Sequence, residues 1–453
     1  MLARSILPFA LLPISFAPAI PTASPAQPGS GHLSKFLYTA AKAYDPIAWL
    51  KGNDRFSSGA TILLSEGNSR RQLVPEFAAT ADPAVSSDAQ RVLFAARPQA
   101  TDSWQIWELS LDEGKPRRVT QGKDDCIRPL YLPGDRIVYA RKTNGRFVIE
   151  SADMWGEKIL PLTYIASNAI PADVLRDGRI LFESGYPLGT DGMPELYTVY
   201  SDGSGIESYR CDHGAARHGA RQASSGDIVF STDHGLARFT SARAQQVAIT
   251  TPQGEYAGEV AEMPSGDSIL PWRPNATSLF QLMRWERGSR ELSPVPTHSD
   301  ENMVEPTPLI QRAGPNRHPS GLHDWENANL LCLNAYSSKY QFAPASIHSV
   351  RVYTQDTNGR PRLLGTALVE RDGSFFLQVP NHRPLQIELL DASGKTLKRE
   401  SGFFWMRRGE QRGCVGCHAG PETAPENAVP MVLLKSTTPA DMTGSAAQGA
   451  GGH

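Results

Sequence analysis

Cysteine is scarce in this chain, with five cysteines in 453 residues. Only one Cys-x-x-Cys pair is present, which excludes a zinc site built from two such pairs. No cysteine precedes Cys126, which excludes a lipid anchor on an N-terminal cysteine. A glycine-rich phosphate loop, a nucleophile elbow and a zincin helix motif are also missing, so the corresponding enzyme classes have no support.

An excess of one charge sign is missing as well. The formal net charge of −2 gives no reason to expect nucleic acid or an anionic membrane surface as a partner. Glycine (39) and proline (35) are both frequent, which is typical of many short strands and turns rather than long helices. The length allows two to three domains with a buried core.

The N-terminus has the pattern of a cleavable signal peptide over residues 1–26. Arg4 supplies a positive charge, residues 6–20 are apolar, and small residues follow. The alternative is an apolar leader or a short anchor, but three prolines interrupt this segment and no second apolar run of about 20 residues follows. We therefore expect no membrane span after cleavage, a linker over residues 27–37, and a periplasmic or secreted protein.

A strand pattern recurs along the next part of the chain: a small or polar turn, then Arg or Asp, then apolar residues. It occupies residues 91–94, 136–139, 179–182, 227–230 and, more weakly, 267–270, at intervals in the forties. This period is that of a four-stranded propeller blade. Alternating strands that end in Asp-Gly or Ser-Gly turns predict β-hairpins within each unit.

These repeats predict an all-β chain with an N-terminal β-propeller over residues 38–342. An earlier unit over residues 46–73 and a later unit near residues 306–333 bring the count to six or seven blades. The rival architecture is a β-sandwich with irregular strands, and the regular repeat favours the propeller.

The repeat stops near residue 343. Short alternating strands separated by tight turns predict a small β-sandwich over residues 343–400. A C-terminal c-type haem segment is expected over residues 401–440. The Gly/Ala-rich tail over residues 441–453 is expected to be disordered.

The haem assignment rests on Cys414, Cys417 and His418, which form the one Cys-x-x-Cys-His in the chain. This spacing is the attachment signature of c-type haem, because each thiol adds to one porphyrin vinyl group and the adjacent imidazole reaches the iron as proximal ligand. A thioredoxin-like redox pair is the alternative. Such a pair lies at the start of a helix in a βαβ unit, and the residues around this motif do not have the pattern of a βαβ unit. One covalent haem c also agrees with export, since c-type haem is attached outside the cytoplasm.

The distal side of the iron decides between electron transfer and ligand chemistry. Met431 follows the motif at a short distance and is a candidate distal ligand, with a core position as its alternative. His323 and His382 are further candidates, although ordinary surface or core histidines are also expected at such positions.

Two stretches resemble known families. Residues 82–88 and 91–94 resemble the Asp-Pro-x-x-Ser-x-Asp-Gly repeat of TolB-type β-propellers. Residues 411–413, which lead into the haem motif, together with residues 425–427 and Pro430, resemble the haem segment of proteins related to the hydrazine synthase alpha subunit. Those proteins also place a propeller before a c-haem domain. Only one Cys-x-x-Cys-His is present, so a second haem domain is not expected.

Cys332 resembles a cysteine that lies upstream of the haem motif in the hydrazine synthase-like proteins. The resemblance implies a position beside the haem, as a ligand or an extra covalent link, while a buried small hydrophobic residue is the alternative. Cys126 and Cys211 follow predicted blades and are candidates for a disulfide in an exported protein.

Charged and imidazole side chains near these segments have two interpretations each. Arg407, Arg408 and Arg412 precede the motif and are candidates for pairing with haem propionates, or else form a solvated basic surface. His213 and His218 suggest a metal site or, more simply, the polar face of a loop between blades.

The sequence therefore predicts an exported mono-haem c-type cytochrome related to the hydrazine synthase alpha subunit. It would carry electron transfer or small-ligand redox chemistry at the iron, as a haem-dependent oxidoreductase in the second case. The alternative is a propeller-based protein-binding module in which the haem is a redox relay or sensor. Either function implies a redox partner protein, with a hetero-oligomer as one form of that partnership.

Overall fold

The computed structural model describes residues 35–67, 69–210, 212–297, 300–356, 359–416 and 428–444. The predicted signal peptide, Cys211, Cys417 and His418 lie outside these ranges. Within the described residues the chain is β-structure apart from the 3-10 turn η1 (Ala48–Lys51) and the helix α1 (Met431–Lys435), which confirms the predicted all-β class. No helix in this described part is long and apolar enough to cross a bilayer.

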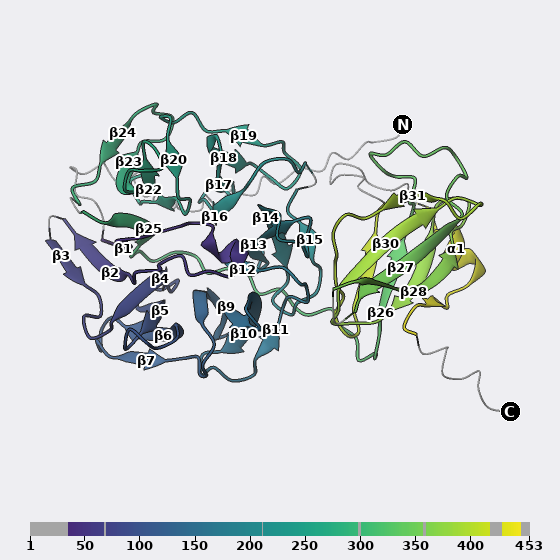
Figure 1. Ribbon diagram of the computed structural model, residues 1–453, viewed down its shortest axis with the longest axis horizontal. Coiled ribbons are helices and arrows are strands. Elements are labelled where there is room, and N and C mark those ends of the chain that lie inside the picture. Colours follow the sequence, from purple (N-terminus) through teal and green to yellow (C-terminus); the bar gives the residue numbers. More distant parts are fainter. Residues whose placement is uncertain are drawn as a thin grey trace, which may run out of the picture. The chain divides into compact units, whose positions relative to one another are not determined.

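Six antiparallel sheets, counted over the described residues, are arranged around a common centre as propeller blades (Figure 1). The first three blades contain β1 (Phe36–Ala41), β2 (Thr61–Glu66), β3 (Ser69–Gln72) and β25 (Asn302–Pro308); β4 (Ala79–Val85), β5 (Arg91–Arg97), β6 (Gln105–Ser110) and β7 (Pro116–Arg118); and β8 (Cys126–Leu132), β9 (Arg136–Thr143), β10 (Arg146–Asp153) and β11 (Leu160–Pro161).

The other three blades follow in chain order. They contain β12 (Ala169–Val174), β13 (Ile180–Tyr186), β14 (Met193–Val199) and β15 (Glu207–Ser208); β16 (His218–Gln222), β17 (Ile228–Thr232), β18 (Gly235–Phe239) and β19 (Val247–Ala248); and β20 (Glu255–Tyr256), β21 (Ala261–Glu262), β22 (Ser268–Arg273), β23 (Gln281–Trp285) and β24 (Leu292–Pro294).

The recurring sequence pattern marks one particular strand of each blade. The five predicted repeats form β5, β9, β13, β17 and β22. Each of these strands lies between two others in its sheet, and β5 is buried continuously from Val92 to Ala96. A strand covered on both faces has a continuous apolar run in place of an alternating one, which explains why this strand was the visible signal.

The ring closes between distant parts of the chain. β25 pairs antiparallel with β1, so the first blade takes its innermost strand from residues 302–308. The predicted extra blade near residues 306–333 is therefore wrong: its beginning belongs to β25, and β26 (Ala328–Cys332) joins a different sheet. The physical reason is that a blade lacking its inner strand exposes an unpaired edge, which β25 covers.

A buried ion-pair cluster occupies the inner strands. Asp82, Arg128, Glu259 and Glu305 all have positive φ, between 56° and 59°, so the backbone is locally distorted at these four charged residues. Arg55 donates a hydrogen bond to Glu305 Oε1 at 2.8 Å and also pairs with Asp82, while Arg128 pairs with Glu259. Each of these side chains is at most 5% exposed. Pairing offsets the large cost of burying isolated charges.

The second domain consists of two four-stranded sheets with a shared apolar core. One sheet has the order β32-β26-β29-β33 and the other β28-β27-β30-β31. Their remaining strands are β27 (Ser349–Gln355), β28 (Pro361–Leu368), β29 (Phe375–Val379), β30 (Leu385–Leu390), β31 (Thr396–Arg399), β32 (Gln411–Cys414) and β33 (Ala440–Asp441).

Two expected boundaries differ from this arrangement. The domain already includes β26, which precedes the expected start at residue 343, and the expected haem segment supplies its edge strand β32. The tail expected to be disordered from residue 441 is ordered at its start, because Met442 is 2% exposed and its amide donates to the Gln378 carbonyl at 2.8 Å. Apolar burial of Met442 keeps this segment on the sheet.

Candidate functional site

The first half of the haem motif is built into a sheet. β26 and β32 are parallel neighbours, and their register places Cys332 directly beside Cys414. β29 runs antiparallel on the other side of β26, with Phe375 opposite Cys332. The row Cys414–Cys332–Phe375 therefore crosses one end of the sheet, although the two cysteines are 82 positions apart in the sequence.

The two thiols have different surroundings. Cys332 is fully buried in the core between the sheets, whereas Cys414 is partly exposed on the edge strand. A hydrogen bond from the Cys332 thiol lowers the pKa of Cys414 to about 7. Cys414 Sγ also lies 3.3 Å from the carbonyl oxygen of Gly416, a hydrogen-bond distance for sulfur. A thiol with this pKa is partly thiolate at neutral pH, which is the nucleophilic form.

A turn after β26 holds the start of the motif. The amide of Leu333 donates to the Cys414 carbonyl at 2.8 Å, and the amide of Ala335 donates to the Gly373 carbonyl at 2.9 Å. A Cβ on Gly416 would overlap the Ser337 carbonyl oxygen, and a Cβ on Gly373 would lie 2.8 Å from the Ala335 nitrogen. Glycine is therefore needed on both sides of the turn over residues 334–337.

Met431 lies at the same end of this sheet. Its amide donates to Asp372 at 2.7 Å, and the next amide, that of Val432, donates to Ser374 Oγ at 3.0 Å. Asp372 and Ser374 immediately precede β29, whose first residue faces Cys332. Since neighbouring strands are about 4.8 Å apart, β29 lies roughly 10 Å from β32, a separation on the scale of a porphyrin. Sequence analysis missed this anchor, because the Asp-Gly pair at 372–373 signalled only a turn.

The two histidine candidates lie toward the opposite end. β29 ends at Val379, opposite Ala328, and His382 follows it. The His382 ring stacks on Tyr164 with centroids 5.0 Å apart, and burial lowers its pKa. His323 precedes β26 and stacks on a tryptophan ring at 4.5 Å. A four-residue step along a strand is about 13 Å, so neither ring shares the end of the sheet that carries Cys414.

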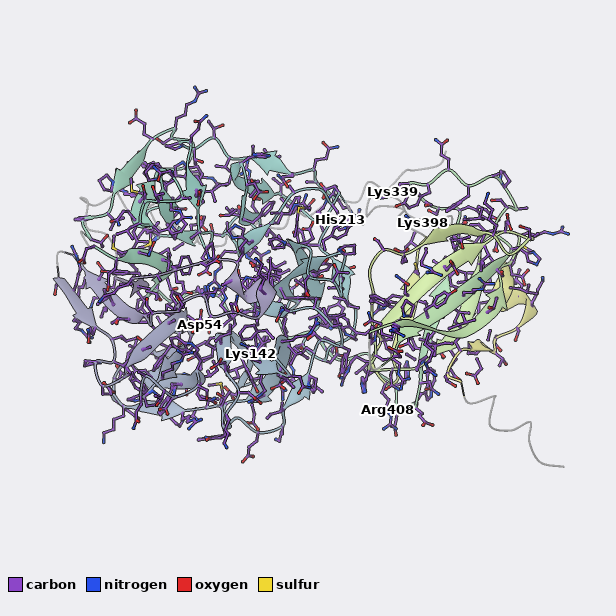
Figure 2. All side chains as sticks on the ribbon, in the orientation of Figure 1. Asp54, Lys142, His213, Lys339, Lys398 and Arg408 are labelled. Carbon is purple, nitrogen blue, oxygen red and sulfur yellow. The ribbon has the colours of Figure 1, made fainter. Side chains whose placement is uncertain are left out.

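The arginines before the motif already have partners. Arg407 contacts the Tyr164 hydroxyl and lies 3.3 Å from the Pro161 carbonyl, and Arg412 pairs with Glu410 at 2.6 Å. Arg408 is 58% exposed and lies 3.2 Å from an aspartate carboxylate (Figure 2). Arg407 and Arg412 thus hold the approach to the motif in place, and Arg408 is the one with an exposed guanidinium.

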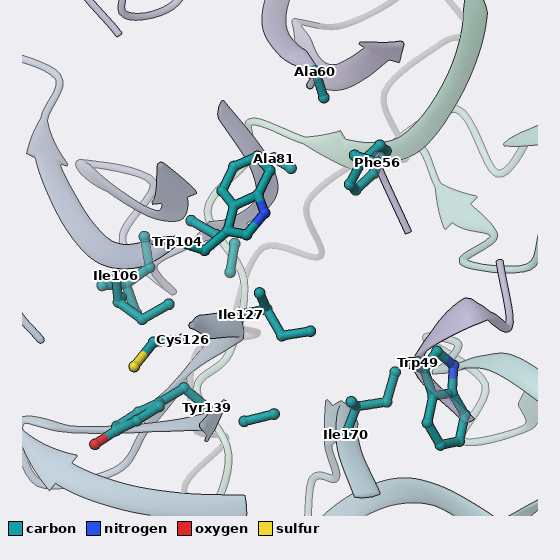
Figure 3. Packing of buried hydrophobic residues seen from close by; sticks show 14 of the residues in the cluster. Trp49, Phe56, Ala60, Ala81, Trp104, Ile106, Cys126, Ile127, Tyr139 and Ile170 are labelled. Carbon is teal, nitrogen blue, oxygen red and sulfur yellow. The ribbon is translucent and has the colours of Figure 1, made fainter. Parts of the chain in front are cut away.

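The remaining cysteine and histidine candidates lie in the propeller. Cys126 is a thiol packed beside Ile106 and Tyr139 in the core between blades, and burial raises its pKa to about 11 (Figure 3). Its suggested partner Cys211 is outside the described residues. His213 lies 3.2 Å from a glutamate carboxylate, and His218, on β16, is a separate side chain with a buried ring nitrogen. No group of three or more potential metal ligands occurs among the described residues.

Residues 335–419 match the family described as the hydrazine synthase alpha subunit middle domain. The structure of Kuenenia stuttgartiensis hydrazine synthase matches with a TM-score of 0.78 and 16% identity, covering 89% of this chain and 71% of that chain. TolB from Acinetobacter baumannii matches with a TM-score of 0.46 and 14% identity, over 60% of this chain and 66% of that chain. No curated protein sequence matches.

The structure defines an all-β protein with a propeller and a second β-domain. The likeness to the hydrazine synthase alpha subunit middle domain covers β27 to β32 of the second domain and the whole Cys-x-x-Cys-His motif, and it leaves out β26 and β33. At 16% identity, the structural match shows a shared fold.

Proposed function

We propose that this protein is an exported mono-haem c-type cytochrome with haem c attached through Cys414 and Cys417 and His418 as the proximal iron ligand. The observation that carries the proposal is the position of the motif: the family match ends one residue after His418. The first cysteine of the motif, Cys414, lies at the end of the edge strand β32, and the pKa of its thiol is lowered to about 7.

The residues around this thiol suit a covalent attachment site. Cys414 presents a partly ionised sulfur at neutral pH, as addition to a vinyl group requires. β32 is an edge strand of its sheet among the described residues, so Cys414 does not lie between two paired strands. Cys332 is buried beside Cys414, and it would therefore lie next to a group attached at that thiol. When bound, the haem supplies an iron that exchanges electrons or binds small ligands.

Met431 is the described candidate for the distal ligand. It is held by the Asp372–Ser374 turn at the end of the sheet that carries Cys414, whereas His323 and His382 lie toward the other end. A thioether ligand would fill the sixth position and favour electron transfer to a redox partner protein. An open sixth position would favour small-ligand redox chemistry, and the protein would then be a haem-dependent oxidoreductase.

The visible spectrum of the periplasmically matured protein separates these two activities. A low-spin spectrum that carbon monoxide does not change indicates a filled sixth position and electron transfer, and Met431→Ala should then convert it to high spin. The matched control is Met193→Ala, because Met193 is an exposed methionine of the propeller. A high-spin spectrum that shifts with carbon monoxide or nitric oxide in the wild type would instead assign ligand chemistry.

A further inference from the structure

Cys332 and Cys414 have the placement of a cysteine pair able to form a disulfide. They are register partners on adjacent parallel strands, and side chains at such positions point to the same face of the sheet. Adjacent strands are about 4.8 Å apart, which lies within the Cα separation of about 4.4–6.8 Å that a disulfide spans. Both side chains pack against the same apolar core.

The two side chains are also within hydrogen-bond reach of each other. A hydrogen bond from the Cys332 side chain lowers the pKa of Cys414, so the register pairing brings the two thiols together. The strands are fixed by four register pairs, from Asn329 beside Gln411 to the cysteines themselves, and by the amide of Leu333 bound to the Cys414 carbonyl.

We propose that Cys332 and Cys414 form a disulfide in the haem-free protein, and that this bond withholds Cys414 from haem until it is reduced. The inference about haem rests on the proposed function, whereas the disulfide does not. In the forward step two S–H bonds are lost and one S–S bond forms. Two protons and two electrons pass to the disulfide of an oxidant, such as oxidised glutathione, which becomes two thiols. A dithiol reductant reverses the step.

This disulfide would prevent haem attachment at Cys414, because a sulfur atom in a disulfide cannot act as the thiolate that adds to a vinyl group. The competing oxidised form joins Cys414 to Cys417 within the motif. The sheet favours Cys332, because β26 and β32 hold its sulfur against Cys414 before any bond forms. Preorganisation of this kind raises the effective concentration of one thiol at the other.

Peptide mapping of the haem-free mature chain tests the disulfide. The protein is made without haem attachment, equilibrated with a mixture of oxidised and reduced glutathione, and digested with trypsin without reduction. The peptides 318–339 and 413–435 contain, respectively, Cys332 alone and Cys414 with Cys417. We expect these two peptides to be linked, with the link retained in Cys417→Ser and lost in Cys414→Ser. An internal disulfide within peptide 413–435 as the dominant product would overturn the proposal.

Haem attachment tests the consequence. Wild type and Cys332→Ser are matured with the c-type haem attachment machinery at a fixed, oxidising glutathione ratio, with Cys126→Ala as the control for loss of a distant buried thiol. We expect several-fold more covalent haem in Cys332→Ser, and equal yields once dithiothreitol is added. Equal yields without reductant overturn the switch and leave the haem proposal standing. Absence of covalent haem in every sample overturns the haem proposal instead, and the linked peptides still report on the disulfide.

Discussion

Removal of the Cys332 thiol should slow the alkylation of Cys414 at neutral pH. The hydrogen bond from Cys332 is the largest cause that lowers the pKa of Cys414 from 9.0 to about 7. At pH 7 about half of Cys414 is then thiolate. Removal of this hydrogen bond in Cys332→Ala should raise the pKa, and a full return to 9.0 would leave about one molecule in a hundred ionised. The more basic thiolate is about six to ten times more nucleophilic, so the net rate of alkylation should fall by about five- to eightfold.

The assay is alkylation of the reduced, haem-free protein by iodoacetamide, followed by mass spectrometry in a Cys417→Ser background. In that background Cys414 is the only cysteine of its tryptic peptide. Cys332→Ser is the matched control, because a serine hydroxyl can still donate to the neighbouring sulfur and should preserve the wild-type rate. Equal rates for wild type and Cys332→Ala across pH 6 to 9 would refute the reasoning.

Three further substitutions should change the stability of the protein. Arg55→Met should lower the free energy of unfolding by about 3–5 kcal/mol in urea melts, because it removes the ion pair of the buried Asp82 carboxylate. Lys35→Ala should cost no more than about 1 kcal/mol, since its ion pair is exposed. Burial lowers the pKa of His218 from 6.5 to about 4, so the folded protein holds it neutral and loses stability as the pH falls through this range; His218→Gln should flatten that loss in thermal melts. Gly416→Ala should destabilise the second domain by about 1–3 kcal/mol in urea, because its Cβ overlaps the Ser337 carbonyl oxygen.

The propeller could be predicted because its signal is local. Each strand in the middle of a blade is buried on both faces and follows a tight turn, so the pattern recurs in the sequence, as from Val92 to Ala96. The closing strand β25 has no such signal, since its pairing with β1 depends on residues about 260 positions away. Because this pairing is non-local, the sequence pattern assigned the start of β25 to an extra blade, whereas the structure pairs β25 with β1.

At the candidate site, too, local features could be predicted from the sequence and non-local contacts could not. The spacing of Cys414 to His418 is a property of neighbouring residues and was visible in the sequence. The contact of Cys414 with Cys332 arises from a parallel strand pair, and the anchoring of Met431 arises from a turn in another strand connection. Parallel strands join segments far apart in the chain, so no local pattern predicts their register. The side-by-side placement of the two cysteines therefore had to come from the structure.

The most direct test of the haem proposal is the mass and pyridine haemochrome of the mature protein after periplasmic expression with the c-type haem attachment machinery. We predict one haem per chain that survives denaturation and acid-acetone extraction, and a haemochrome spectrum typical of two thioether links, both abolished in the Cys414→Ser, Cys417→Ser double variant. A wild-type protein that carries no covalent haem, while another c-type cytochrome matures in the same cells, would contradict the proposal.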